Sequence, residues 1–198
     1  MNPPRLHAIV SGRFAMGLRA GDVRVAYPLF QAEGGGSIPT SALQLRFEVI
    51  DRLTMETLNR KWHSRLPRLN TACPCPVYYG AEFDGLWYAV AAWSPPVARL
   101  LPQTTWLELR RLAIADDAPK NAATRMIGWM VRDIRKRFPV IERLVSYQDT
   151  AVHNGAIYRA AGWTGTSVAN GGQWNYAGRR RDGERIADKI RWELDLSR

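Results

Sequence analysis

This sequence is poor in lysine and cysteine and has no long apolar run. No apolar stretch approaches the roughly 20 residues that a transmembrane helix needs, and the opening MNPPRLHAIVSGRF lacks the apolar core of a secretory signal. Cysteine occurs only at Cys73 and Cys75, in CPCP, which is too tight for an ordinary disulfide or a CxxC metal site. We therefore expect no membrane partner, reduced thiols and a cytoplasmic location.

Arginine supplies almost all of the positive charge. The chain has 28 Lys and Arg against 18 Asp and Glu, a net charge of +10 and a pI near 10.2, yet lysine stands only at positions 61, 120, 136 and 189. A guanidinium group binds phosphates and guanine edges through two parallel hydrogen bonds, which an ammonium group cannot do. The pattern favours an anionic partner, most simply nucleic acid. The alternative is an Arg-rich composition without function, as in a high-GC genome.

Length and composition fit one globular domain. With 198 residues, of which 46% are hydrophobic and 23% charged, the chain can bury a sizeable core. Residues 1–42 are interpreted as an N-terminal extension that ends in the Gly-rich connector AEGGGSIPTSA. Residues 43–198 are interpreted as the domain proper.

The first half of that domain predicts a strand, a helix and a hairpin. LQLRFEVI, from residue 43, suits a strand. The runs 77–83 and 86–93 flank Asp84-Gly85, which is a strong signal for a type I′ turn. KIRWELDL, near the C-terminus, alternates like a final strand. The helix between the first strand and the hairpin is expected to bury Met55, Leu58, Trp62 and Leu66.

The stretch from Glu108 to Trp163 predicts a strand, a long helix, a second strand and a short helix. In α/β sheets, ligands bind where strands end and helices begin, and phosphate groups bind at helix N-termini. Asn121 is expected to cap the long helix and Pro139 to end it. The apolar face of the long helix is expected to comprise Ala123, Met126, Ile127, Met130, Val131, Ile134 and Phe138.

This stretch resembles motifs A and B of the GNAT acyltransferase superfamily. The resemblance implies an α/β fold, with a single GNAT-like domain whose mixed central β-sheet is flanked by helices, and acetyl-CoA or a related acyl donor as cofactor. GNAT enzymes bind the coenzyme A pyrophosphate on a loop with spaced glycines, whereas the corresponding loop here, DDAPKNAAT, has none. The residues expected to contact the cofactor are Arg111, Lys120, Asn121, Ala122 and Ala123.

Several uncommon short sequence motifs follow one another along most of the chain: WHSRLP (62–67), WSPPVAR (93–99), ELRRLAI (108–114), APKNAATR (118–125), SYQD (146–149) and HNGAIYRAAGW (153–163). In this order they resemble the Mom family of phage DNA-modification proteins, a divergent GNAT branch. The resemblance implies conversion of adenine in duplex DNA to N6-carbamoylmethyladenine, which protects phage DNA from host restriction. It also implies a phage- or prophage-encoded protein in a bacterial host, with double-stranded DNA and a small-molecule donor as partners. The oligomeric state stays open, a homodimer included.

His63, Asp149 and Tyr158 are the candidate catalytic residues. His63 falls off the apolar face of its helix and lies in WHSRLP, and an imidazole can serve as base or metal ligand near neutral pH. Asp149 ends a strand, where a carboxylate can orient or deprotonate the exocyclic amine of adenine. Tyr158 matches the tyrosine with which GNAT enzymes protonate the departing thiolate. The alternatives are a surface histidine, a loop or helix cap and a packed tyrosine; a redox metal such as iron on His63 and Asp149 also stays open.

Arginines are the candidates for DNA contact. Arg110 and Arg111 lie in a strand, so we expect them to face opposite sides of the sheet, with Arg111 toward the cleft. The residues expected to bind the DNA backbone are Arg65, Arg68, Arg179, Arg180 and Arg181. The side chains that could stack on a flipped base, although each is more often core, are Trp87, Trp93, Trp163 and Trp174.

The chemistry of the product separates three possible functions. Acetyl transfer would leave an N-acetyl group, whereas a carbamoylmethyl group joins N6 through a CH2 carbon, which is an alkylation. Alkylation requires either a donor of a glycine-like unit or a rearrangement after the initial attack, and the base must first leave the stack. The alternatives are an acyl-CoA-dependent N-acetyltransferase acting on a small amine or protein, and a non-catalytic DNA-binding protein on a GNAT fold.

Overall fold

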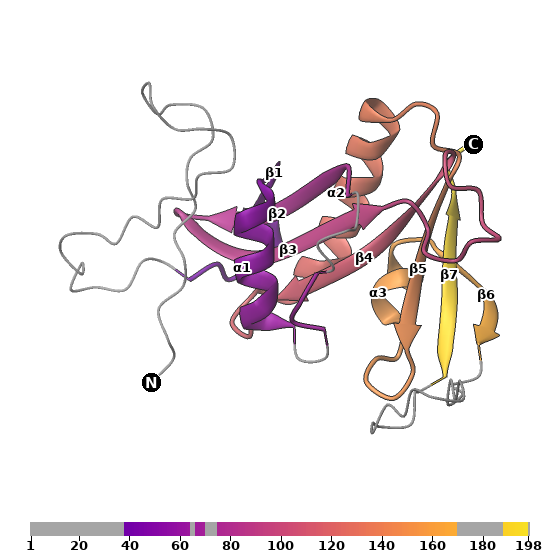
Figure 1. The fold of residues 1–198 in the computed structure, drawn as a ribbon. Coiled ribbons are helices and arrows are strands. Elements are labelled where there is room, and N and C mark those ends of the chain that lie inside the picture. Colours follow the sequence, from indigo (N-terminus) through magenta and orange to yellow (C-terminus); the bar gives the residue numbers. More distant parts are fainter. Residues whose placement is uncertain (1–37, 64–65, 70–74, 170–187, 198) are drawn as a thin grey trace, which may run out of the picture.

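A computed structural model describes residues 38–63, 66–69, 75–169 and 188–197. The helices are η1 (Ala42–Gln44), α1 (Arg52–Trp62), α2 (Ala122–Arg137) and α3 (Ala156–Ala160). The strands are β1 (Arg46–Val49), β2 (Val77–Phe83), β3 (Leu86–Ser94), β4 (Trp106–Ile114), β5 (Arg143–Asp149), β6 (Thr164–Ala169) and β7 (Lys189–Asp195). They form one mixed seven-stranded sheet in the order β1-β2-β3-β4-β5-β7-β6 (Figure 1). The predicted α/β class is confirmed.

The hairpin between β2 and β3 forms as the sequence predicts. Asp84 and Gly85 both have positive φ, at 51° and 75°, which a type I′ turn requires at its two central residues. The turn sets β2 and β3 antiparallel, with Phe83 paired to Leu86. The buried strand β3 thereby becomes the centre of the sheet's first half.

Helices cover both faces of the sheet, α1 in front of it and α2 behind it in Figure 1. On the α1 face, Met55 and Leu58 pack with Val90, Ala92 and Ala113. The larger core lies on the α2 face and includes Tyr79, Ala91, Trp93, Leu109, Met126, Ile127, Met130, Ile134, Leu144, Tyr158 and Trp192. Side chains on one side of the strands therefore pack against α1, and those on the other side pack against α2.

One prediction about helix ends is wrong, and another is confirmed for the position but not for the side-chain hydrogen bond. Helix α1 ends at Trp62 with His63 as its C-cap, so Leu66 lies beyond the helix and is exposed. Asn121 is the N-cap position of α2, but it adopts a left-handed conformation (φ 68°) and its side chain makes no capping hydrogen bond. Asparagine tolerates this backbone conformation better than most residues, so it takes the place of a glycine in the loop.

Strands β4 and β5 are the sheet's parallel pair, and they separate partway along. Their pairing runs from Trp106 with Arg143 to Leu109 with Ser146 and is not continued beyond. The second half of β4, which still pairs with β3, therefore diverges from the end of β5, which still pairs with β7. The result is a fork in the sheet, with α3 behind it.

A β-bulge in β4 lies at the start of this fork. The register shifts between Ala92, which pairs with Arg111, and Trp93, which pairs with Leu109, so Arg110 is the additional residue. A bulge re-aims the side chains that follow it. Leu109 therefore faces α2, whereas Arg111, opposite Ala92, faces α1. The expectation that Arg110 and Arg111 face opposite sides assumed unbroken alternation, which the bulge interrupts. Arg111 lines the cavity as predicted, and so does Arg110.

Candidate active site

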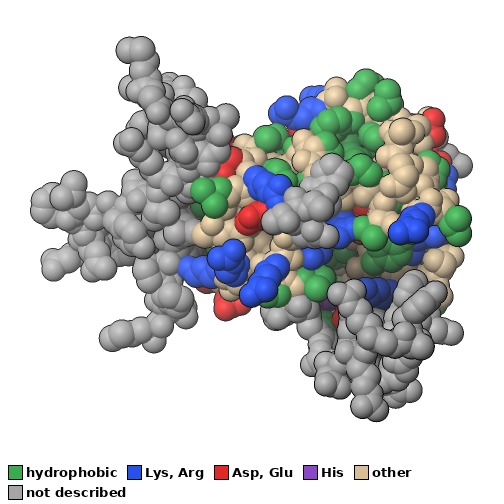
Figure 2. Space-filling model, in the orientation of Figure 1, with side chains coloured by type: hydrophobic (Ala, Val, Ile, Leu, Met, Phe, Trp, Pro, Cys, Tyr) green, Lys and Arg blue, Asp and Glu red, His purple; other side chains and the backbone are tan. Residues whose placement is uncertain are grey.

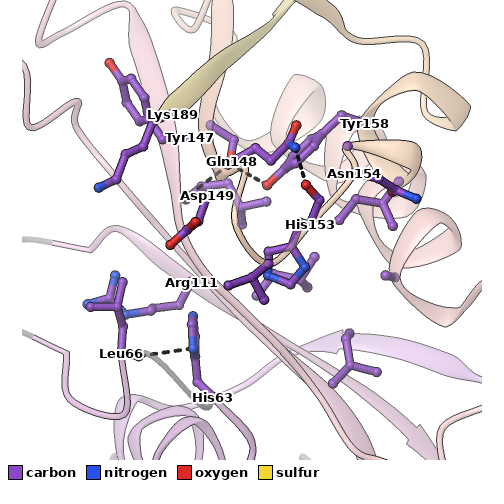
Figure 3. Close-up of a pocket in the computed structure, with 18 of the residues that line it drawn as sticks. His63, Leu66, Arg111, Tyr147, Gln148, Asp149, His153, Asn154, Tyr158 and Lys189 are labelled. Atoms are coloured by element: carbon purple, nitrogen blue, oxygen red, sulfur yellow. Dashed lines mark hydrogen bonds between the residues drawn. The ribbon is translucent and has the colours of Figure 1, made fainter. Parts of the chain in front are cut away.

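A cavity of about 540 Å³ occupies the fork. It is lined from the end of α1, the second half of β4, the start of α2, the end of β5, α3 and the start of β7 (Figure 3). Strand alternation along β5 divides the lining into two parts. We call His63, Arg111, Asp149 and Lys189 the α1 half of the cavity, and Ala123, Ser146, Gln148 and Tyr158 the α2 half.

Tyr158 lies at the point where the two strands part. Its side chain is buried, and its hydroxyl is 2.9 Å from Oγ of Ser146, the last β5 residue that pairs with β4. Burial raises the pKa of Tyr158, although the Ser146 hydrogen bond opposes the shift. The phenol therefore stays protonated at neutral pH and can act as a hydrogen-bond or proton donor toward the cavity that it lines.

The Tyr158 ring is held by a buried network that the sequence does not reveal. Trp192 stacks on the ring with centroids 5.5 Å apart, and its indole Nε1 donates to Oε1 of Gln148 at 2.8 Å. The Gln148 amide nitrogen donates in turn to the carbonyl of His153 at 2.5 Å. Gln148 thus ties the turn before α3 to β7, and the α2 half is packed and internally hydrogen-bonded.

Gly155, the N-cap of α3, completes this packing. Its φ is 72°, and a Cβ atom there would lie 2.5 Å from Oε1 of Gln148 and 2.6 Å from Cζ2 of Trp192. Only glycine fits both the left-handed backbone and the close approach. In the turn before α3, Oδ1 of Asn154 accepts from the N–H of Ala156, the first residue of the helix.

His63 is oriented by the segment that follows α1. Its Nδ1 accepts a hydrogen bond from the backbone N–H of Leu66 at 3.2 Å, and the carbonyl of Leu66 accepts from the buried amide of Asn59 at 3.0 Å. Partial burial, then the charge of Arg111, lowers the pKa of His63. A neutral ring whose Nδ1 accepts carries its proton on Nε2. His63 is thus a hydrogen-bond donor.

The metal-ligand role of His63 stays a prediction, and the Nδ1 hydrogen bond is the observation that bears on it. A ligating histidine usually binds through one nitrogen and donates through the other, whereas Nδ1 of His63 already accepts a hydrogen bond. Among the described residues, no group of three or more His, Cys, Asp or Glu side chains comes together. Half-buried Cys75 is in no disulfide with a described residue.

Arg111 and Asp149 lie on the same side of the cavity as His63 (Figure 3). Arg111 is anchored through Nη1 to the carbonyl of Arg110 at 2.7 Å and through Nη2 to the carbonyl of Arg68 at 3.1 Å. Oδ1 of Asp149 accepts from the N–H of Ala151 at 2.9 Å, which fixes the carboxylate at the end of β5. The loop-cap alternative for Asp149 therefore holds, and the same carboxylate also lines the cavity.

The start of α2 contributes less to the lining than the sequence predicted. Ala123 lines the cavity, whereas Ala122 is buried in the core and Lys120 and Asn121 are exposed outside the lining. With no side-chain cap and no acidic residue in the first turn, the N–H groups of that turn suit an anionic group. The small Ala123 leaves room beside them.

The structure describes only some of the predicted DNA-contacting and stacking residues. Arg68 is exposed beside the α1 half. The Trp side chains at 87, 93 and 163 are buried in the core, so they do not stack on a base. Residues that lie outside the described ranges are Arg65, Trp174, Arg179, Arg180 and Arg181.

Comparisons with known proteins agree with this geometry. The sequence profile of the Mom protein family matches residues 44–191. A Bacillus subtilis acetyltransferase in complex with CoA superposes with a TM-score of 0.58 and 13% identity, over 77% of this chain and 99% of that one. An Elizabethkingia anophelis GNAT family acetyltransferase with acetyl-CoA bound has a TM-score of 0.58 and 12% identity over the same shares of the two chains.

The Escherichia coli ribosomal-protein-S18-alanine N-acetyltransferase has a TM-score of 0.57 and 10% identity, over 78% of this chain and 95% of that one. At such low identity these likenesses establish the GNAT fold alone. No curated protein sequence gives a significant match. None of the described helices is long and apolar enough to span a membrane.

Proposed function

The chain belongs to the Mom protein family, and on this premise we propose that it is a GNAT-like transferase that converts adenine in duplex DNA to N6-carbamoylmethyladenine. In a phage, this modification protects DNA from host restriction. The net charge of +10 supports an anionic substrate. The observation that carries the proposal is the divided cavity at the β4–β5 fork, with a buried phenol in one half and charged groups in the other.

The α2 half suits the donor. The N–H groups at the start of α2 and the small side chain of Ala123 fit a phosphate-bearing group, such as the diphosphate of an acyl-CoA. For carbamoylmethylation the donor must carry its CH2 carbon on a leaving group. The bond between CH2 and that group breaks as the bond to N6 forms, and the departing group must gain a proton. The contacts of Tyr158 with Ser146 and Trp192, which hold a protonated phenol, support Tyr158 as the donor of this proton.

The α1 half suits the adenine. Formation of the bond between N6 and the CH2 carbon releases one proton from the exocyclic amine. The position of the Asp149 carboxylate in the cavity lining supports Asp149 as its acceptor. The Nε2–H group of His63 and the guanidinium of Arg111 are donors, which match the ring-nitrogen acceptors of adenine. Because N6 is inaccessible within a duplex, the nucleotide must be extruded first.

The second candidate function is an acyl-CoA-dependent N-acetyltransferase. The fold favours it, because two similar solved structures are an acetyltransferase in complex with CoA and one with acetyl-CoA bound. The product distinguishes the two, since acetyl transfer joins nitrogen to a carbonyl carbon and carbamoylmethylation joins it to a CH2 carbon.

The test is nucleoside mass spectrometry on plasmid DNA from cells that express the chain, its Asp149→Asn variant or an Asp84→Asn control. Asp84 is exposed in the β2–β3 turn, so this control makes the same carboxylate-to-amide change away from the cavity. We expect deoxyadenosine heavier by a carbamoylmethyl group with the wild type and Asp84→Asn, and none with Asp149→Asn. Unmodified DNA from folded wild-type protein would contradict the proposal and favour the acetyltransferase or a non-catalytic DNA-binding protein.

A further inference from the structure

Two exposed cationic residues, Arg68 and Lys189, adjoin residues of the α1 half. On one side, Arg68 has an exposed side chain, and its backbone carbonyl holds Arg111 of the cavity at 3.1 Å. On the other side, Lys189 is exposed, lines the cavity and pairs with Asp149 across β5 and β7. In Figure 3 the Lys189 side chain lies across the opening from His63 and Leu66. An anion that enters between these residues meets positive charge on both sides.

Charge is also unevenly distributed along α1, with positive charge at the end next to the cavity. Its acidic groups lie toward its start, where Asp51 caps the helix and Glu56 pairs with Arg52 at 2.6 Å. Its last turn carries Arg60 and Lys61, both exposed, directly before His63. Figure 2 shows Lys and Arg side chains gathered over α1 and continuing across this face toward β5 and β7. The basic face therefore leads to the opening of the cavity.

A nucleotide extruded from a duplex keeps one phosphate on each side of its sugar, so a protein that receives it needs cations on both sides of its opening. We propose that Arg68 and Lys189 contact these two phosphates, and that Arg60 and Lys61 contact the backbone farther along the duplex. This docking surface, Arg60, Lys61, Arg68 and Lys189, rests on the proposed function and specifies how the DNA approaches that site.

A second basic cluster provides the comparison. Arg135 and Lys136 are also exposed, in the last turn of α2. That helix covers the other face of the sheet, and at 1.5 Å per residue Arg135 lies about 18 Å along its axis from Ala123 in the cavity. DNA held there would not bring a base to His63 and Asp149. The second cluster is instead placed to complement the helix dipole.

The two clusters allow a matched experiment. The double variant Arg68→Ala/Lys189→Ala and the control Arg135→Ala/Lys136→Ala each remove one arginine and one lysine, and the first leaves the Arg68 carbonyl on Arg111. Binding of a fluorescently labelled DNA duplex is measured by anisotropy at several salt concentrations. For the first variant we expect the slope of log K against log salt to fall by about 0.9 for each lost phosphate contact, and affinity at 0.1 M salt to fall roughly tenfold per contact. The control should retain the wild-type slope.

Equal losses in both variants, or a loss only in the control, would overturn the docking surface. Competition by an RNA duplex of the same sequence that matches DNA in affinity would overturn the assignment of DNA as the partner. The nucleoside assay separates this inference from the proposed function. If adenine is modified but the Arg68→Ala/Lys189→Ala variant binds DNA like the wild type, only the docking surface is contradicted. If the variant loses DNA affinity as expected but no modified adenine is found, only the proposed chemistry is contradicted.

Discussion

The two halves of the cavity are built in opposite ways. The α2 half is buried and cross-bonded: Ser146 holds the Tyr158 hydroxyl, Trp192 stacks on the ring, and Gln148 ties Trp192 to the turn before α3. The α1 half carries charged or polar side chains that are only partly buried, and exposed cations adjoin it. A preorganised half suits a chemical step that needs a fixed proton donor, and an open, basic half suits a large anionic substrate.

The fork itself explains why the halves differ. Ser146 and Leu109 are the last paired residues of β5 and β4, and beyond them each strand has a free edge toward the cavity. On the α2 face, α3 and the core of α2 close over these edges. On the α1 face, α1 contacts β2, β3 and β4, which leaves Lys189 at the end of β7 exposed.

The largest effect should come from removing one oxygen atom in the α2 half. Tyr158→Phe keeps the stacking on Trp192 but removes the proton donor, so we expect DNA modification to slow by about 10²- to 10⁴-fold. The matched control is Tyr79→Phe, whose hydroxyl is 2.8 Å from Oδ2 of Asp133 outside the cavity lining. Thermal melts should show a modest loss of stability in both variants, near 1 kcal/mol for a lost hydrogen bond. Full activity of Tyr158→Phe would remove the phenol from the mechanism.

A second test asks whether the α2 half is as rigid as its packing indicates. Gly155→Ala adds left-handed strain and an overlap with Gln148 and Trp192, and we expect it to lower the free energy of unfolding by about 3 kcal/mol. Gly162→Ala is the matched control, because its φ is 79° but no atom lies within 4 Å of the added Cβ. Gly162→Ala should lower the free energy of unfolding only through the left-handed backbone strain, by about 1–2 kcal/mol. If urea unfolding gives the same loss in free energy of unfolding for both variants, the side chains around Gly155 can move aside, and the α2 half is not rigid there.

The smallest effect concerns the donor in the α1 half. His63→Gln retains an N–H donor, so it should keep more activity than His63→Ala. Burial lowers the pKa of His63 below its ordinary value of 6.5, so the folded state binds fewer protons there than the unfolded chain. The contribution of the neutral ring to stability is therefore complete above pH 6.5 and is lost as the pH falls through the lowered pKa. The measurement is the free energy of urea unfolding of wild type and of His63→Gln between pH 5 and 8. The difference between the two free energies should change as the pH falls below 6.5. A difference independent of pH would contradict this protonation state.

Sequence patterns predicted the scaffold well because periodicity and turn chemistry act locally. The hairpin at Asp84-Gly85, the buried face of α2 and the alternating strand β7 all follow from spacing alone. Resemblance to known families placed His63, Asp149 and Tyr158 among the site residues, and all three line the cavity.

Features that depend on distant contacts were not predictable in this way. The bulge at Arg110 is a property of the β3–β4 register, and it reverses the side on which later residues face. Gln148 binds Trp192, which is 44 positions away, and no local signal marks that pair. Asn59 looked like an ordinary helix residue, yet its buried amide holds the Leu66 carbonyl and so helps to orient His63.

The central claim is that the two halves bind different molecules, and one binding experiment tests it directly. Calorimetric titration with acetyl-CoA and with duplex DNA is performed on wild type, Arg68→Ala/Lys189→Ala and Ala123→Glu. Glutamate in the first turn of α2 favours the helix dipole but repels a diphosphate. The account predicts that Arg68→Ala/Lys189→Ala loses affinity for DNA and keeps acetyl-CoA binding, whereas Ala123→Glu loses acetyl-CoA binding and keeps DNA binding. The division of the cavity is wrong if each variant loses affinity for both ligands equally. It is also wrong if Arg68→Ala/Lys189→Ala loses acetyl-CoA binding and Ala123→Glu loses DNA binding.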